Sequence, residues 1–492
     1  MPRDATSRGV LRGRFAASRR PALRQWLAAF TVLASLAGLV VLQRRDAVDV
    51  SAPTTARSAV PVLQPAALAS TWFCPGVPGN DESISGRYVI SNAGDTPVGG
   101  TITRFVVQGA ATRQRFAVQP RSTIEVDALV NLDSSYVASI VETQGAPVSV
   151  EQRIVHRAGD AVSLCASSPS AEWFLADGFT GEGSIEQVVV SNPALDSAIL
   201  DVTFVTANGE RSPQSLKGVV IPPESVRVFD LAALDAQNEA TLAVSVRATV
   251  GRVVVGRSQH YLGRGRLGYG MSLGASATST RWYFADSLKA PTAAEEYIVF
   301  NPSRTDQQVT MIITPDGAEA LEPVVITAPA QRVTKFAPSG LSNLPEGRYS
   351  VIASVSGDGA GVVIERAITS QEAKSTATVV ALGAPAAATR WTAPSGVAIN
   401  VEDCLRVFNA GANPATFSVT YLGPAGEVPV VGYESVSLAP GASASVMLGD
   451  ATLAATVTVV ASEPVVVARR VSRGVKQPLL GSAPLIAAVG QS

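Results

Sequence analysis

The motif with the most specific chemistry is Gly-Met-Ser-Leu-Gly at residues 270–274, which matches the G-x-S-x-G pattern of a hydrolase nucleophile elbow. A nucleophile elbow needs a tight turn from a strand into a helix, because that turn exposes the serine hydroxyl. No helical pattern follows the motif, and a related stretch has Ala381 where this one has Ser272. We therefore interpret Ser272 as a structural residue of a strand, and we predict no catalytic residue in the chain.

The two histidines, His156 and His260, are the other candidates for chemistry. Each lies three residues after the arginine of a V-x-x-R stretch. Protein zinc sites commonly use H-x-x-x-H or C-x-x-C spacings, and neither spacing occurs in the chain. We expect no metal, no cofactor and no small-molecule substrate, and we predict that the protein is not an enzyme.

Tryptophan and arginine recur at regular intervals along the chain. The tryptophans begin four related stretches separated by 101, 109 and 109 residues: Trp72 in STWFCPG, Trp173 in EWFLADG, Trp282 in RWYFADS and Trp391 in RWTAPSG. Each copy later has a V-x-x-R run, and these runs end at Arg153, Arg257, Arg366 and Arg469. Exposed tryptophans could bind sugar and exposed arginines could bind anions. A tryptophan in an opening strand favours the core, however, and a recurrent arginine at the margin of an apolar face favours a structural role.

The period of about a hundred residues predicts the fold. Short runs rich in Val and Thr are separated by Gly, Pro, Asn and Asp, a pattern typical of strands joined by tight turns. Seven or eight such strands match the size of an immunoglobulin domain. We therefore predict an all-β protein with four tandem immunoglobulin-like β-sandwich repeats at 71–169, 170–279, 280–388 and 389–492. A β-propeller with two blades per copy is the alternative.

The repeat motifs also carry a resemblance. The combination W-[FY]-x-A-[DE]-G, an apolar strand ending in Asn-Pro and then V-x-x-R is similar to a β-sandwich module repeated in bacterial cell-surface proteins. Together with a single membrane anchor, it resembles an uncharacterised actinobacterial membrane-anchored envelope family known only as a domain of unknown function. The likeness covers about residues 70–488 and is closest in the second and third copies. It implies an architecture and a surface location, and it implies no catalytic residues.

Three cysteines in an exported chain predict one disulfide and one spare thiol. The alignment of the copies puts Cys74 in the opening strand of the first copy and Cys165 in its closing strand. We predict a disulfide between these two residues. Cys404 lies on an apolar strand, and we interpret it as a buried free thiol, with intermolecular pairing as the alternative.

The N-terminal residues are unlike the rest of the chain. Residues 26–42 have no charge, and as a helix they would span about 25 Å, enough for a membrane crossing when flanking arginines snorkel. Seven arginines precede this segment and two follow it, which predicts a cytoplasmic basic tail at 1–25, a transmembrane signal-anchor helix at 26–42 and an extracytoplasmic body. A cleaved signal peptide is the alternative. Residues 43–70, rich in Pro and Ala, are predicted to form an extended tether.

The charge of the body bears on its partners. After residue 45 the chain has 30 basic and 39 acidic side chains, which disfavours nucleic-acid binding. The expected partners are the membrane, through residues 26–42, and an envelope protein or cell-wall polymer. The expected function is a non-enzymatic, membrane-anchored extracytoplasmic rod that acts as a scaffold or protein-interaction component of the bacterial cell envelope. The alternative is an envelope glycan-binding or adhesion module.

Overall fold

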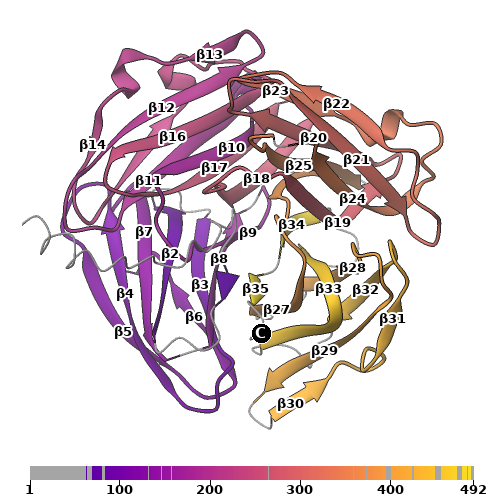
Figure 1. The fold of residues 1–492 in the computed structure, drawn as a ribbon. Coiled ribbons are helices and arrows are strands. Elements are labelled where there is room, and N and C mark those ends of the chain that lie inside the picture. The colour runs from indigo at the N-terminus through magenta and orange to yellow at the C-terminus, as the bar shows by residue number, and fades with distance from the viewer. Residues whose placement is uncertain are drawn as a thin grey trace, which may run out of the picture. The chain divides into compact units, whose positions relative to one another are not determined.

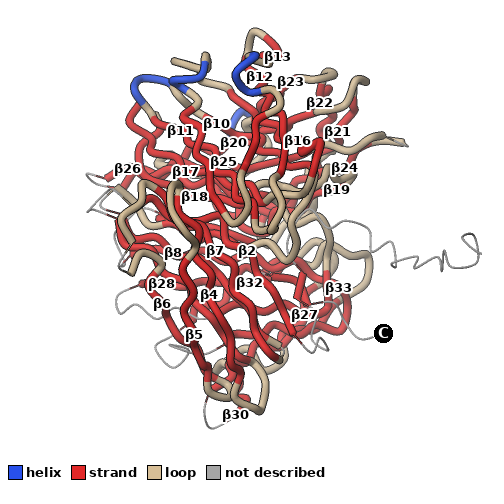
Figure 2. The backbone as a smooth tube through the Cα atoms, turned by 90° about the vertical axis from the view of Figure 1, so that its left-hand side faces the viewer, coloured by secondary structure: helices blue, strands red, loops and turns tan. Residues whose placement is uncertain are grey.

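The computed structural model describes residues 62–63, 69–79, 84–130, 132–145, 147–156, 158–263, 265–357, 359–372, 375–394, 401–423, 426–448, 456–473, 479–484 and 486–488. These residues belong to one unit, Arg57–Ser492. Within them the chain forms β-strands and short 3-10 turns, which Figure 2 shows in red and blue. No helix among the described residues is long and apolar enough to cross a membrane, and the segment predicted to do so, 26–42, lies outside them.

The strands fall into four successive groups. The first repeat contains β2 (Ala69–Pro78), β3 (Ile84–Asn92), β4 (Val98–Val106), β5 (Thr112–Val118), β6 (Ser122–Asp127), β7 (Tyr136–Gln144), β8 (Val148–His156) and β9 (Ala161–Leu164). The second contains β10 (Glu172–Gly178), β11 (Ile185–Asn192), β12 (Ala198–Thr206), β13 (Gly209–Arg211), β14 (Val219–Ile221), β15 (Ser225–Asp230), β16 (Leu242–Val250), β17 (Val254–Gly263) and β18 (Arg266–Leu273).

The other two groups follow the same plan. The third repeat contains β19 (Arg281–Lys289), β20 (Ala293–Asn301), β21 (Gln307–Pro315), β22 (Val324–Ala328), β23 (Arg332–Phe336), β24 (Gly347–Val355), β25 (Val363–Glu372) and β26 (Ser375–Leu382). The fourth contains β27 (Ala388–Pro394), β28 (Val401–Phe408), β29 (Ala415–Gly423), β30 (Gly426–Pro429), β31 (Val436–Leu438), β32 (Ser443–Leu448), β33 (Thr456–Arg473), β34 (Leu479–Pro484) and β35 (Ile486–Ala488).

Each repeat is built from two antiparallel sheets, and the chain crosses between them several times. In the first repeat the sheets are β2-β7-β4-β5 and β6-β3-β8-β9, and in the third they are β19-β24-β21-β22 and β23-β20-β25-β26. The order is therefore first, sixth, third and fourth strand in one sheet, and fifth, second, seventh and eighth in the other. The second repeat has the same order, with β13 and β14 both paired to β12. In the fourth, the single long strand β33 pairs with β27 and β29 through its first part and with β28 and β34 through its second.

Four strands of each repeat recur in the description below. We call β2, β10, β19 and β27 the opening strands, and β3, β11, β20 and β28 the asparagine strands, because an asparagine ends or directly follows each of them. The arginine strands are β8, β17, β25 and the second part of β33, and the closing strands are β9, β18, β26 and β34. The closing strands β9, β18 and β34 lie near the middle of Figure 1, with the repeats around them.

Buried tryptophans join the two sheets of every repeat. The indole Nε1 of each donates to the carbonyl oxygen of a valine at or just before the start of the arginine strand: Trp72 to Val148 at 3.2 Å, Trp173 to Val253 at 2.8 Å, Trp282 to Val362 at 2.9 Å and Trp391 to Val465 at 2.9 Å. All four side chains are at most 2% exposed. The tryptophan thus satisfies its one donor while its ring fills the space between the sheets.

Buried asparagines fix the turn after each asparagine strand. Nδ2 of Asn92, Asn192, Asn301 and Asn409 donates to the carbonyl oxygen four residues later, at 2.8 Å in every repeat. Oδ1 accepts the N–H two residues later, which closes an Asx turn. Each asparagine is fully buried, so the side chain replaces the strand pairing that the backbone gives up at this point.

The four repeats close on one another. The closing strands contact in the order β9, β18, β26, β34 and back to β9. The opening strand of each repeat contacts the arginine strand of the next, as β2 with β17, β10 with β25, β19 with β33, and β27 with β8 of the first repeat. We call these contacts the first–second, second–third, third–fourth and fourth–first junctions. The extended rod expected from the sequence is therefore wrong, because the first and fourth repeats are in contact.

Gly268 shows how close the approach is between closing strands. It has φ +120°, and a Cβ at this position would lie 3.2 Å from Thr378 N of the third repeat and 3.3 Å from Ala158 O of the first. Backbones of three repeats therefore meet around one residue of β18. Only glycine combines this φ with the absence of a side chain.

The chain before the first repeat also joins the fourth. The strand β1 (Val62–Leu63) pairs in parallel with β35, and β35 pairs with the opening strand β27. The prediction of an extended tether over 43–70 is therefore wrong at these two residues, which are part of a sheet. The pairing adds a backbone connection between the two ends of the repeat region.

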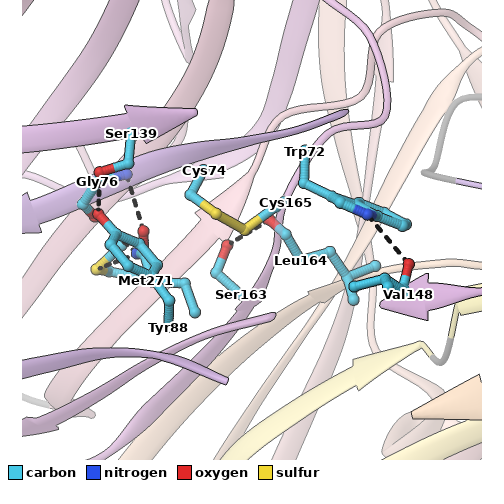
Figure 3. Close-up of a disulfide and its surroundings, with 11 residues drawn as sticks. Trp72, Cys74, Gly76, Tyr88, Ser139, Val148, Ser163, Leu164, Cys165 and Met271 are labelled. Carbon is cyan, nitrogen blue, oxygen red and sulfur yellow. Dashed lines mark hydrogen bonds between the residues drawn. A yellow bond between two sulfur atoms is a disulfide. The ribbon is translucent and has the colours of Figure 1, made fainter. Parts of the chain in front are cut away.

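The predicted disulfide is confirmed, because Cys74 and Cys165 are bonded (Figure 3). In the second and third repeats the positions of this pair hold Leu175 with Gly274, and Phe284 with Gly383. A Cβ on Gly383 would lie 2.7 Å from Cζ of Phe284. The closing-strand position is thus glycine wherever a large side chain faces it, and cysteine where a cross-link replaces that contact. Cys404 is buried and free, as the sequence indicated.

Replacement of both Cys74 and Cys165 by alanine should lower the free energy of unfolding by up to about 4–5 kcal/mol, because the bridge joins residues 91 apart in the chain. Denaturation curves of the wild type and the variant would measure the change. Reductant should lower the free energy of unfolding of the wild type by a similar amount and should not change that of the double variant. The variant Cys404→Ala, which removes a thiol but no cross-link, is the control. An unchanged transition in the double variant would contradict the prediction.

Candidate functional site

The recurrent arginines occupy one position of the fold, and the first repeat does not have one there. Arg257, Arg366 and Arg469 each lie four residues after the valine that accepts the tryptophan N–H. They pair with the residue four before the asparagine: Val188, Tyr297 and Leu405. The same rules in the first repeat lead to Gln152, which pairs with Tyr88.

The assignment of Arg153 to the repeated arginine position is therefore wrong by one residue. Its side chain is 13% exposed, and its guanidinium lies 2.6 Å from Glu151. Gln152 is buried, and its amide donates to Gly76 O at 2.7 Å and accepts from Gly76 N at 3.0 Å. The neutral side chain thus bonds the backbone of the opening strand, where the other repeats bury a charge.

Each buried arginine has an acid partner in its own repeat. This partner lies six residues before the asparagine and is Glu186, Glu295 or Asp403 in the second, third and fourth repeats. Arg469 Nε donates to Asp403 at 2.7 Å, and Glu186 and Glu295 interact electrostatically with Arg257 and Arg366. The first repeat has Gly86 at this position, so it lacks both the arginine and the acid. Loss of both leaves no buried charge uncompensated.

Two junctions add a second acid, from the neighbouring repeat. At the second–third junction, Arg257 Nη2 lies 3.1 Å from Glu365 Oε1. The other oxygen, Glu365 Oε2, accepts the backbone N–H of Asp177 at 2.6 Å. At the fourth–first junction, Arg469 donates to both carboxylate oxygens of Glu151, at 3.0 and 3.1 Å. Both glutamates occupy the residue before the arginine position of their own strand. Both ion pairs are almost completely buried.

The other two junctions have no acid at this position. The second repeat has Gly256, where a Cβ would lie 2.4 Å from the Pro75 side chain, and the fourth has Ala468. These two junctions also differ from the charged ones at the residue that pairs with the second aromatic of the opening strand. The partner of the outward aromatic Phe73 or Tyr283 is an isoleucine, Ile140 or Ile352.

The corresponding positions at the charged junctions hold hydroxyl residues. Ser245 pairs with Phe174 at the second–third junction, and Thr458 pairs with Thr392 at the fourth–first junction. A hydroxyl residue and an isoleucine therefore alternate at this position around the four repeats, and the third–fourth junction has ion pairs at other positions, Arg406–Asp316 and Arg470–Asp286. The sequence pattern did not predict this alternation, because it becomes visible only when the residues are compared by strand register.

Around Arg257, burial raises the pKa of Glu186 and Glu365, whereas the pKa of Asp177 is lowered. Burial raises the pKa of the Glu186 carboxyl to about 8, although Arg257 opposes the shift. Its Oε2 accepts the Phe179 N–H at 3.0 Å, and Oε1 has no hydrogen-bond partner among the described residues. Burial acts on Asp177 too, but Arg266, which donates to it at 2.8 and 3.0 Å, and Arg257 hold its pKa below the ordinary range. Glu186 is therefore neutral and Asp177 charged at pH 7.

The histidines come together, which sequence spacing did not predict. His156 and His260 meet at the first–second junction with ring centroids 5.1 Å apart, and Tyr269 lies 4.7 Å from His156. His156 Nδ1 accepts the Ala158 N–H at 3.2 Å. In the described part of the chain, no cluster of three or more His, Cys, Asp or Glu residues is arranged to hold a metal ion.

Ser272, the residue of the G-x-S-x-G motif, lies in the closing strand β18. Its hydroxyl accepts a hydrogen bond from Arg257 Nη2 at 3.0 Å, and its side chain is buried. The interpretation of Ser272 as a strand residue agrees with this position. The serine adds a hydrogen bond to the guanidinium at the second–third junction.

Sequence comparison gives the protein a family. Residues 133–400 and 368–488 match the family of unknown function DUF5719. The chain belongs to DUF5719. The two matches overlap at residues 368–400. No curated protein matches the DUF5719 chain.

Among solved structures, the DUF5719 chain has a match to the crystal structure of Thermotoga maritima 1070. The two share 11% sequence identity, and the match covers 22% of this chain and 93% of the other, with a TM-score of 0.20. A likeness at this level adds nothing to the description of the fold.

In this DUF5719 protein, Glu365→Gln should lower the free energy of unfolding by roughly 3 kcal/mol, because Arg257 stays buried without its inter-repeat carboxylate. The double variant Arg257→Met/Glu365→Gln should lower the free energy of unfolding by less than the sum of the decreases in the two single variants. Chemical denaturation gives the three values. The exposed inter-repeat pair Arg113–Glu224 is the matched control, and Glu224→Gln should cost less than about 1 kcal/mol. Strict additivity at Arg257 and Glu365 would contradict the coupling.

Glu186→Gln should flatten the pH dependence of the stability of the DUF5719 protein. The folded pKa of about 8 exceeds the unfolded value of 4.5, so the native state binds the extra proton between these values and stability falls as pH rises. Relative to the variant, the free energy of unfolding of the wild type should fall by up to about 1.4 kcal/mol per pH unit between pH 5 and 8. Denaturation midpoints measured across this range test the difference. Parallel curves for the two proteins would refute the assignment.

Proposed function

We propose that the protein is a non-enzymatic scaffold of the bacterial cell envelope, anchored in the membrane through residues 26–42, with its repeats outside the cytoplasm. The observation that carries the proposal is the use of the recurrent side chains. Three of the four repeated positions hold a buried arginine that binds acids of its own or a neighbouring repeat, and all four tryptophans bond backbone carbonyls. The repeated chemistry therefore supports assembly of a rigid body.

Each repeat of this body is, in the proposal, a β-sandwich and not a pair of propeller blades. The repeated crossing of the chain between the two sheets supports this, because a propeller blade is made of consecutive strands. The pairing of the second strand with the fifth, and of the third with the sixth, is shared with immunoglobulin domains. The repeats differ from those domains at their edges, where the first strand pairs with the sixth and the seventh with the second.

The glycan-binding alternative loses its original basis. A sugar-binding tryptophan must expose a ring face, and these four rings are buried. A ladder of anion contacts likewise needs exposed arginines, whereas Arg257, Arg366 and Arg469 are at most 3% exposed. A scaffold that binds through its outer loops and sheet faces requires neither.

The scaffold proposal predicts a location and a partner that can be measured together in intact cells. A membrane-impermeant amine-reactive cross-linker should label the exposed Lys217 of the full chain and capture a defined envelope protein. Cells that lack the chain are the control for background. Absence of labelling would contradict the extracytoplasmic location. Labelling without any captured protein would contradict the scaffold role.

A further inference from the structure

The second–third junction contains a cavity of about 430 Å³, which is within the size range of small-molecule sites. One side is the outward face of the sheet β10-β16-β12, where Phe174, Ser245 and Thr203 form a row across three paired strands. The other side comes from the third repeat and includes Phe300 and the turn 302–304. Two repeats therefore contribute to one cavity.

Comparison with the other junctions explains why the space is open. At the third–fourth junction the position of Ser245 holds Ile352, which packs with Tyr283 against the core of the fourth repeat. At the first–second junction it holds Ile140, which packs against a cluster that includes Val189 of the second repeat. Serine is smaller than isoleucine by several carbon atoms, so the apolar filling of this position is missing at the second–third junction.

The lining is rich in hydroxyl groups. Five of the lining residues carry one: Thr203, Ser245, Ser276, Thr278 and Ser303. Hydroxyls both donate and accept hydrogen bonds, so they complement a ligand that has many hydroxyls of its own. Thr278 already donates to Ala360 O at 2.9 Å and Ser303 to Asn301 Oδ1 at 2.7 Å, so these two hydroxyls serve a ligand as acceptors. The half-buried ring of Phe174, whose centroid lies 6.3 Å from that of Phe300, adds an apolar surface for C–H groups.

The charges of the lining are balanced. Arg247 lies 3.8 Å from Glu172, and Glu210 accepts a hydrogen bond from Gln331 at 2.9 Å, while Arg304 is exposed at the rim. Two guanidiniums and two carboxylates give no net charge to attract an anion or a cation. The lining therefore favours a neutral, polyhydroxylated ligand over a charged one.

We propose that this cavity is a binding site for a short neutral saccharide, with Ser245 as the residue that provides the space. The site is independent of the buried tryptophans, and the proposal does not depend on the scaffold role. The ring of Phe174 faces the apolar side of a sugar, and the hydroxyls of Ser245 and Thr203 bond its edge.

The test measures binding of cellobiose, maltose and N,N′-diacetylchitobiose to the full chain by calorimetry and saturation-transfer NMR, in a detergent without a sugar head group. At least one disaccharide should bind saturably. Ser245→Ile, which introduces the residue found at Ile140 and Ile352, should weaken binding at least ~10-fold because it fills the cavity. Ser245→Thr keeps the hydroxyl and should bind.

Thr249→Ile is the matched control, because Thr249 is exposed on the outward face of the same strand and does not line the cavity. It should bind as the wild type does. Denaturation midpoints show whether each variant is folded. The proposal is overturned if none of the three disaccharides binds, if Ser245→Ile binds unchanged, or if Thr249→Ile loses binding equally.

Discussion

A guanidinium withdrawn from water needs compensating partners, and buried carboxylates supply them across two of the four junctions. The arginine position lies inside its repeat but next to the following one, and for Arg257 and Arg469 the neutralising groups come from both repeats. Arg469 illustrates this with Asp403 in its own repeat and Glu151 in the first. Burial of the charge is thereby linked to correct docking, since a separated repeat would leave its arginine with fewer partners. Specific geometry between repeats follows from a requirement within each one.

In the first repeat the buried arginine and its acid partner are both absent. Gln152 replaces the cation and Gly86 replaces the anion, so no unpaired charge remains. The same repeat has the disulfide, at a closing-strand position that is glycine in the second and third repeats. A covalent link between the opening and closing strands and an ionic network around the arginine strand are two ways to hold the edges of the same two-sheet unit together.

Local patterns predicted the local features of the fold. Tryptophan spacing revealed the repeats, strand-like runs predicted the all-β class, and alignment of copies predicted the Cys74–Cys165 bridge. The contact between first and fourth repeats could not be predicted, because it depends on residues more than three hundred positions apart. Arg153 was misassigned because V-x-x-R in the first copy is displaced by one residue. The acids six residues before each asparagine, with Gly86 as the exception, are the signal that would have corrected it.

The strand β33 makes the contacts that complete the assembly, and it is synthesised after the first three repeats. Its Thr456 contacts Ser91 and its Arg469 contacts Glu151, across sequence separations of 365 and 318 residues. Contacts of such separation form late, because the loops between them must first be ordered. The first repeat must therefore persist without its final neighbour while the rest of the chain folds. Its disulfide and its uncharged Gln152 make it the repeat best able to do so, since neither depends on the fourth repeat.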